Sequence, residues 1–108
     1  MLLEVGDRGQ FLSAVASGHA ARGTRGGDVV CAAVSVLLRT AVLGLERLGP
    51  QIEAADRGFL SFRVGGCPDS ALALLCFTAE FLERGLRTLM QEYPSSVHLC
   101  VRRGVVCA

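Results

Sequence analysis

The chain has 108 residues, a length that predicts one domain spanning residues 1–108. Apolar residues make up 51% of it, which excludes a disordered chain. Its 11 basic and 10 acidic residues leave a formal net charge of +1. Charges so evenly balanced give no overall field for nucleic acid or an anionic membrane, so neither direct DNA binding nor membrane attachment is expected.

Cysteine usage predicts a reducing, cytoplasmic environment. The count is odd, and Met1–Glu4 has neither the basic nor the apolar region of a secretory signal, so a disulfide framework is not expected. The longest apolar stretch, Val29 to Leu45, is shorter than the roughly 20 uninterrupted apolar residues that a membrane-spanning helix needs. The five cysteines are Cys31, Cys67, Cys76, Cys100 and Cys107.

Two strands and a glycine-rich loop are predicted first. Leu2–Val5 and Gln10–Ala16 are predicted strands, and the turn signal Gly6–Gly9 between them makes the pair antiparallel. The segment Gly18–Gly27 follows, with four glycines and no apolar period. It is therefore predicted to be a mobile loop.

A long helix is predicted next, from Val29 to about Leu48. Asp28 is the expected N-cap, because its carboxylate can accept a hydrogen bond from an unpaired N–H of the first turn. The helix is apolar nearly all round, which predicts burial on more than one side. Gly49-Pro50 ends it.

The second half contains a predicted hairpin and a final strand. Gln51–Ala55 and Phe59–Val64 are the hairpin strands, joined by a turn at Asp56–Gly58. The last strand is predicted over Val97–Arg102, with its odd-numbered residues facing inward.

The second helix lies between the hairpin and the last strand. It is predicted to begin after a cap at Asp69 or Ser70 and to run to about Glu92. Two i,i+4 acid–base pairs, Glu80–Arg84 and Glu83–Arg87, mark its solvent face. Its predicted core stripe is Ala71, Leu74, Leu75, Thr78, Leu82, Leu86 and Leu89.

The element order β-β-α-β-β-α-β predicts an α+β fold. Both helices can pack on one antiparallel or mixed sheet, which makes a two-layer sandwich.

Cys31 is the cysteine whose position suggests chemistry. With Asp28 as N-cap, it occupies the third position of the first helical turn. Unpaired N–H groups and the positive end of the helix dipole lie there, and both favour a thiolate over a thiol. The same N–H groups can stabilise the oxyanion of a tetrahedral intermediate.

His19 is the candidate general base for that thiol. It lies at the opposite end of the glycine-rich loop, twelve positions before Cys31. A flexible loop of this length can bring the two side chains together. An imidazole beside the sulfur would take the thiol proton and later return it to the leaving amine.

Asp28 and Ser35 are candidates for supporting roles. Ser35 lies one helical turn after Cys31 on the same face, and Asp28 can orient His19, although it cannot do so fully while it caps the helix. Each of these residues also has a structural interpretation. A cysteine in an apolar helix is commonly a small buried hydrophobe, and Ser35 can bond to a carbonyl of its own helix.

Two further motifs carry weaker signals. His98 and Cys100 share one face of the last predicted strand, but two ligands fall short of the four of a structural zinc site, so no metal is expected. Gly23–Gly27 precedes a helix as a phosphate-binding loop does, yet it lacks the lysine that ends a P-loop. No cofactor is expected.

Taken together, these residues follow the pattern G-H-A-x-x-G-x-x-G-x-D-x-V-C-A-x-x-S from Gly18 to Ser35. The pattern resembles that of the bacterial ribosomal-processing cysteine protease Prp family. Length and element order fit as well, so the resemblance extends over essentially the whole chain.

The resemblance implies a cysteine endopeptidase of the cytoplasm. Its substrate would be the N-terminal extension of large-subunit ribosomal protein twenty-seven, whose removal supports ribosome assembly, and the enzyme would be a homodimer. His19 and Cys31 match the catalytic pair of the family, and Asp28 and Ser35 match its supporting residues. The loop that orders over bound peptide would contain Gly18, Gly23, Gly26 and Gly27.

Two other functions remain open from the sequence. The first is a ribosome-associated binding protein that keeps the fold without catalysis. Retention of both His19 and Cys31 disfavours it, because a binder does not need the pair. The second is a thiol-based redox sensor that uses Cys31 and a second, resolving cysteine.

Overall fold

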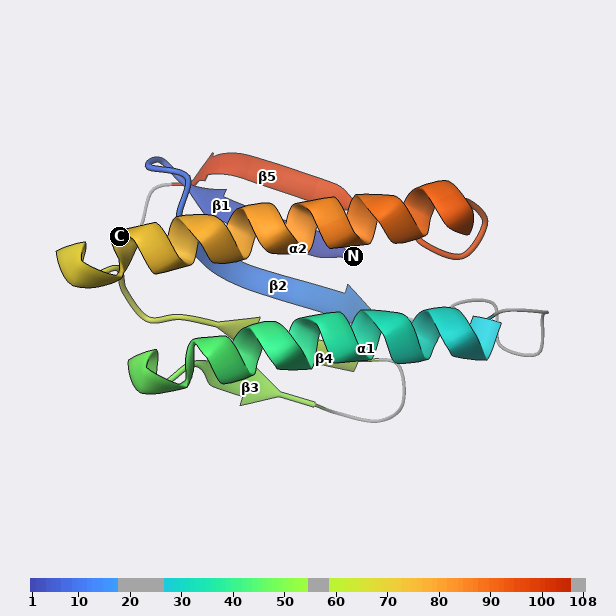
Figure 1. The fold of residues 1–108 in the computed structure, drawn as a ribbon, viewed down its shortest axis with the longest axis horizontal. Helices are drawn as coiled ribbons and strands as arrows, with labels where there is room; N and C mark the ends of the chain where they lie inside the picture. Colours follow the sequence, from blue (N-terminus) through green and yellow to red (C-terminus); the bar gives the residue numbers. More distant parts are fainter. Residues whose placement is uncertain (18–26, 55–58, 106–108) are drawn as a thin grey trace.

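A five-stranded sheet forms one layer of the protein, and two helices cover one of its faces (Figure 1). The computed structural model describes residues 1–17, 27–54 and 59–105. The helices lie side by side and run in opposite directions across the sheet (Figure 1). The predicted α+β two-layer sandwich is confirmed.

The sheet is mixed, with strand order β3-β4-β2-β1-β5. Three of its pairings are antiparallel, including the two predicted hairpins β1–β2 and β3–β4. The fourth pairing joins β1 and β5 in parallel, with Leu2 opposite Cys100. The five strands are β1 (Leu2–Gly6), β2 (Phe11–Ser17), β3 (Gln51–Glu53), β4 (Phe59–Arg63) and β5 (Cys100–Val105).

Each strand differs from its predicted bounds by at least one residue, and the largest differences are at β5 and β3. β5 begins at Cys100, three residues later than predicted, because the backbone N–H groups of Ser96 and Val97 donate to the carbonyl of Tyr93 and are not free for the ladder. Val97 is nevertheless buried, as predicted. β3 ends at Glu53, and the predicted turn at 56–58 lies outside the described residues.

The two helices are α1 (Gly27–Gly44) and α2 (Leu72–Glu92). α1 ends before Leu48, because the chain continues into a 3₁₀ turn over Glu46–Leu48. That turn closes at Gly49, whose φ of 62° is left-handed and favours glycine.

The predicted cap of α2 at Asp69 or Ser70 is wrong. Both residues lie inside a 3₁₀ turn, Asp69–Ala71, and neither side chain caps a helix. The backbone closes this turn instead, since the N–H of Ala71 donates to the carbonyl of Pro68 at 2.8 Å. The helix itself starts at Leu72, later than predicted, and its end at Glu92 is confirmed.

The core fills the space between the sheet and the helices. Phe11 of β2 and Phe62 of β4 stack at 5.2 Å between ring centroids, and both are fully buried. From α2, five members of the predicted stripe are buried, and Leu74 and Leu89 are half-buried. The five are Ala71 at the preceding turn, Leu75, Thr78, Leu82 and Leu86.

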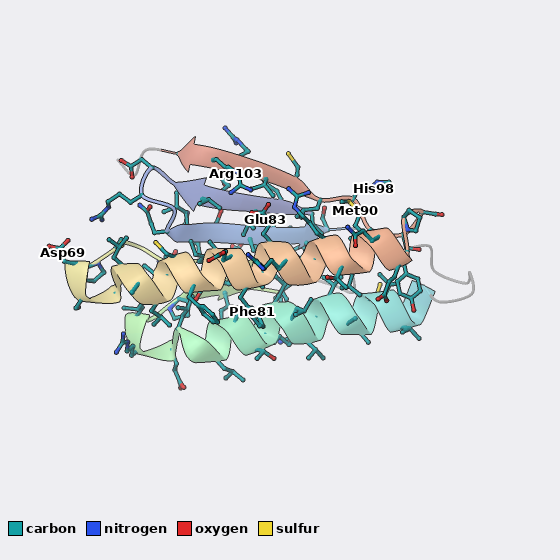
Figure 2. The ribbon with its side chains drawn as sticks, turned by 45° about the horizontal axis from the view of Figure 1, so that its top comes forward. Asp69, Phe81, Glu83, Met90, His98 and Arg103 are labelled. Atoms are coloured by element: carbon teal, nitrogen blue, oxygen red, sulfur yellow. The ribbon has the colours of Figure 1, made fainter. Side chains whose placement is uncertain are left out.

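Glu83 joins α2 to the edge strand β5. Arg103 of β5 donates to both of its carboxylate oxygens, at 2.6 and 2.5 Å, and Arg87 donates to one of them at 2.9 Å. Figure 2 shows Glu83 and Arg103 facing each other across the two elements. Only 17% of the Glu83 side chain is exposed, so its predicted place on the solvent face is wrong, although its pairing with Arg87 is confirmed.

Replacing Glu83 by glutamine is expected to cost about 1–2 kcal/mol of stability at pH 7. Burial alone raises the pKa of Glu83, but hydrogen bonds from Arg103 and Arg87 and the attraction of both guanidinium groups outweigh it, so the pKa is lowered. A lowered folded-state pKa stabilises the protein above the ordinary carboxyl value of about 4.3. That contribution is lost as the pH falls through the folded-state pKa.

Urea denaturation at pH 7, 5 and 3 tests this expectation. The stability difference between wild type and Glu83→Gln should shrink toward pH 3. Asp69→Asn is the matched control, because Asp69 pairs with Arg8 at 3.6 Å through a fully exposed carboxylate and its loss should change nothing measurable. A difference for Glu83→Gln that is the same at all three pH values would contradict the assignment.

Candidate active site

Cys31 lies near the start of α1 and is partly buried. The helix is held to the sheet by the fully buried side chains of Val30 and Leu38. Ser35, one turn after Cys31, is also half-buried. The structure therefore brings these two predicted residues to one side of one helix, as expected from their spacing.

That side of α1 faces away from α2. Leu37 marks the side that meets α2, because a Cβ built on Gly85 of α2 would lie 3.2 Å from its Cδ2 atom. In a helix of 3.6 residues per turn, Cys31 and Ser35 lie about 120–160° round the helix from Leu37. Their side of α1 therefore points toward the β3 end of the sheet, over which α1 lies (Figure 1).

Among the described residues, no strand pairs with the edge of the sheet on this side. β3 is an edge strand, and all three of its residues are exposed. Ile52 lies opposite the core residue Phe62, so it points to the face of the sheet that carries the helices. Sequence analysis did not single out Ile52. An apolar residue in a three-residue edge strand gives no signal until the strand order is known.

The start of α1 corrects the prediction for Asp28. The helix begins at Gly27, so Asp28 is its second residue and Cys31 its fifth, where a cap and a third position were expected. The first four N–H groups of a helix lack partners within it, and Cys31 follows them.

The remaining predicted site residues lie largely outside the described residues. These are His19 and the loop residues Gly18, Gly23 and Gly26. Gly27 belongs to α1 and not to the loop before it. Contact between His19 and Cys31 therefore stays a prediction.

The other described cysteines are free thiols. Cys76 of α2 lies against the β1–β2 turn, with its sulfur 3.4 Å from the carbonyl oxygen of Arg8, so it packs that turn onto the helix. Cys67 is packed against the core, and Cys100 is exposed at the start of β5.

The prediction that His98 and Cys100 share one face of the last strand is wrong. His98 precedes β5, Cys100 begins it, and both are exposed. Within residues 1–17, 27–54 and 59–105, no three His, Cys, Asp or Glu side chains gather as metal ligands would. In the same part of the chain, neither helix is apolar enough over a sufficient length to span a membrane.

Comparison with known proteins found one family and several solved structures. A family model described as cysteine protease Prp matches residues 3–98. The chain is similar to the ribosomal processing protease Prp of Staphylococcus aureus in complex with a substrate peptide. The two are 25% identical with a TM-score of 0.75, and the match covers 94% of this chain and 96% of that one.

Two further structures support the same likeness. SMU.848 of Streptococcus mutans is 25% identical with a TM-score of 0.75, over 94% of this chain and 91% of that one. The S. aureus protease with a covalently linked product peptide is 24% identical with a TM-score of 0.71, over 94% and 95% of the two chains. No curated protein matches the sequence.

Proposed function

Because the chain belongs to the family of the cysteine protease Prp, we propose that it is a cysteine endopeptidase with Cys31 as nucleophile and His19 as general base. The observation that carries the proposal is the place of Cys31. It lies near the start of α1, partly exposed, on the side that faces the open edge of the sheet. Both residues fall inside the matched region, 3–98.

The proposed reaction passes through an acyl-enzyme. His19 takes the proton of the Cys31 thiol, and the sulfur attacks the scissile carbonyl carbon. Unpaired N–H groups of the first residues of α1 stabilise the oxyanion. His19 gives its proton to the leaving amine, then takes one from the water that hydrolyses the thioester, and Cys31 leaves as the free thiol.

The supporting residues act on these groups. Ser35, on the same side of α1 as Cys31, is proposed to donate a hydrogen bond to the sulfur or the substrate, and Asp28 to orient His19. The loop with Gly18, Gly23 and Gly26, together with Gly27 at the start of α1, is proposed to close over bound peptide.

The proposed substrate is the N-terminal extension of large-subunit ribosomal protein twenty-seven, cut in the cytoplasm. In support, the S. aureus relative is described as an essential ribosomal processing protease and is seen with a substrate peptide. An extended peptide could add to the free edge of β3, with an apolar side chain beside Ile52. The second proposed partner is another copy of this chain.

Cleavage of a synthetic peptide that spans the extension tests the proposal. Mass spectrometry should find a single cut by the wild type, none by His19→Ala, and none in a peptide of the same composition in scrambled order. Binding of an intact peptide by the wild type would instead identify a non-catalytic ribosome-associated protein. A disulfide at Cys31 after mild peroxide, without cleavage, would identify a redox sensor.

A further inference from the structure

Arg39 interrupts the apolar sequence of α1. From Val29 to Gly44 the helix contains no other charged residue. Arg39 is exposed, and so are the apolar residues Val36 and Leu43 of the same helix. A guanidinium group is stable in water without a partner, so the role of Arg39 depends on what lies beside it.

The position of Arg39 places it in one row with Cys31. Cys31, Ser35 and Arg39 follow one another at intervals of four residues, so each lies about one turn further along the helix and about 40° further round it. Arg39 therefore lies about 80° round the helix from Cys31 and about 12 Å beyond it along the axis. The row has a thiol at one end, a hydroxyl in the middle and a cation at the other end.

This row lies on the side of α1 away from α2. Leu37 marks the side that meets Gly85 of α2, and Arg39 lies about 160° round the helix from it. Arg84 and Arg87 of α2 each bind a glutamate of their own helix. Within residues 1–17, 27–54 and 59–105, by contrast, no carboxylate binds Arg39. This part of the chain therefore leaves the donors of Arg39 to an outside ligand.

A peptide on the free edge of β3 would pass Arg39 on its way to Cys31. α1 ends at Gly44 and β3 begins at Gln51, so the short connection keeps β3 beside the second half of the helix (Figure 1). Arg39 belongs to that half, whereas Cys31 lies near the helix start. Ile52 of β3 points to the face of the sheet on which the helix lies.

The separation of Cys31 and Arg39 determines which residue of the peptide meets the cation. An extended peptide rises about 3.3 Å per residue, so about 12 Å along the helix corresponds to three or four residues. A carboxylate is the side chain that a guanidinium binds best, because the two planar groups can form two parallel hydrogen bonds.

We propose that Arg39 selects substrate peptides that carry an acidic side chain three or four residues from the scissile bond. The inference rests on the proposed function and deepens it, since it assigns a charge preference to one part of the peptide. The contact is remote from the reacting atoms and equally strong before and during the reaction. It therefore lowers KM and leaves kcat unchanged.

Kinetics with two pairs of extension peptides test the proposal. In the first pair, the third and fourth residues before the observed cut are both Glu in one peptide and both Gln in the other. In the second pair, the third and fourth residues after the cut are exchanged in the same way, because a strand can add to β3 in either direction. For the wild type, KM should be about threefold to tenfold lower for the Glu peptide in one of the two pairs. The difference should shrink in 0.5 M NaCl, since salt screens exposed charges.

Charge reversal at Arg39 supplies the decisive comparison. Arg39→Glu should raise KM for the preferred Glu peptide above that of its Gln partner, and Arg39→Lys should keep part of the preference. Arg47→Glu is the matched control for net charge. Arg47 lies in the 3₁₀ turn after α1, is exposed, and also binds no carboxylate within the three described ranges. It should keep the wild-type preference, and circular dichroism checks that all variants fold.

Two results would overturn the inference alone. One is cleavage of all four peptides by the wild type with equal KM within each pair, and the other is the same change in preference for Arg39→Glu and Arg47→Glu. Four peptides left intact by the wild type would instead overturn the proposed function and, with it, the inference.

Discussion

Replacing Cys31 by alanine is expected to lower kcat/KM for the extension peptide by about 10⁴-fold or more. The change removes the only atom proposed to bond to the scissile carbonyl, and no neighbouring hydroxyl of equal nucleophilicity replaces it. Because Cys31 is only partly buried, the fold should keep its stability to within about 1 kcal/mol. A fluorogenic peptide gives the rate, and thermal denaturation gives the stability.

Cysteines elsewhere in the molecule provide the controls. Cys67 is partly buried, as Cys31 is, and Cys100 is exposed. Cys67→Ala and Cys100→Ala should both cleave at the wild-type rate, because neither lies on the side of α1 that faces the open sheet edge. Full activity of Cys31→Ala would remove Cys31 from the mechanism, and equal loss in all three variants would indicate a general effect of thiol removal.

Phe62→Ala should lower the free energy of unfolding by about 3–5 kcal/mol. Phe62 is fully buried in β4 and stacks on Phe11 of β2, so truncation removes its own contacts and half of the aromatic pair. A domain has a net stability of only about 5–15 kcal/mol. Urea denaturation should therefore show a large fall in the transition midpoint.

Ile52→Ala is the control for that substitution. Ile52 lies directly opposite Phe62 in the β3–β4 ladder, but 53% of it is exposed, so it has much less packing to lose. The expected loss is below about 1 kcal/mol. Similar losses for the two variants would mean that the core does not extend between β4 and the helix layer as described.

Local patterns predicted most of the fold. The two-residue period identified β4, in which Leu60 and Phe62 are buried and Arg63 is exposed. The helical period identified the buried stripe of α2, with Ala79 as an unpredicted member. Both predictions succeeded for the same reason. Apolar residues that recur at the period of their own helix or strand must all face the layer on which that element packs.

Features set by distant residues were not predictable in the same way. Glu83 was placed on the solvent face because its local partner, Arg87, is four residues away, whereas Arg103 reaches it from β5, twenty residues later. Asp69 looked like a cap because of its residue type, yet the backbone after Pro68 closes the turn without any side chain.

The candidate site also has features that the local sequence predicted and features that depend on distant residues. Sequence placed Cys31 at the start of a helix, and the helix begins two residues earlier than expected. Which way Cys31 faces depends on where α2 packs against Leu37, and no pattern within α1 contains that information. The partnership with His19 remains a prediction from spacing and resemblance.

The parallel pairing of β1 with β5 has a consequence for biosynthesis. The Met1 ammonium group donates to the His98 carbonyl at 2.7 Å, and the Cys100 N–H donates to Met1, so the sheet is completed by residues 97 positions apart. Contacts of such long sequence separation form late and slowly. In a chain still emerging from the ribosome, β1 would lack its partner β5 along one edge. The sheet described here would therefore form fully only after β5 had been synthesised.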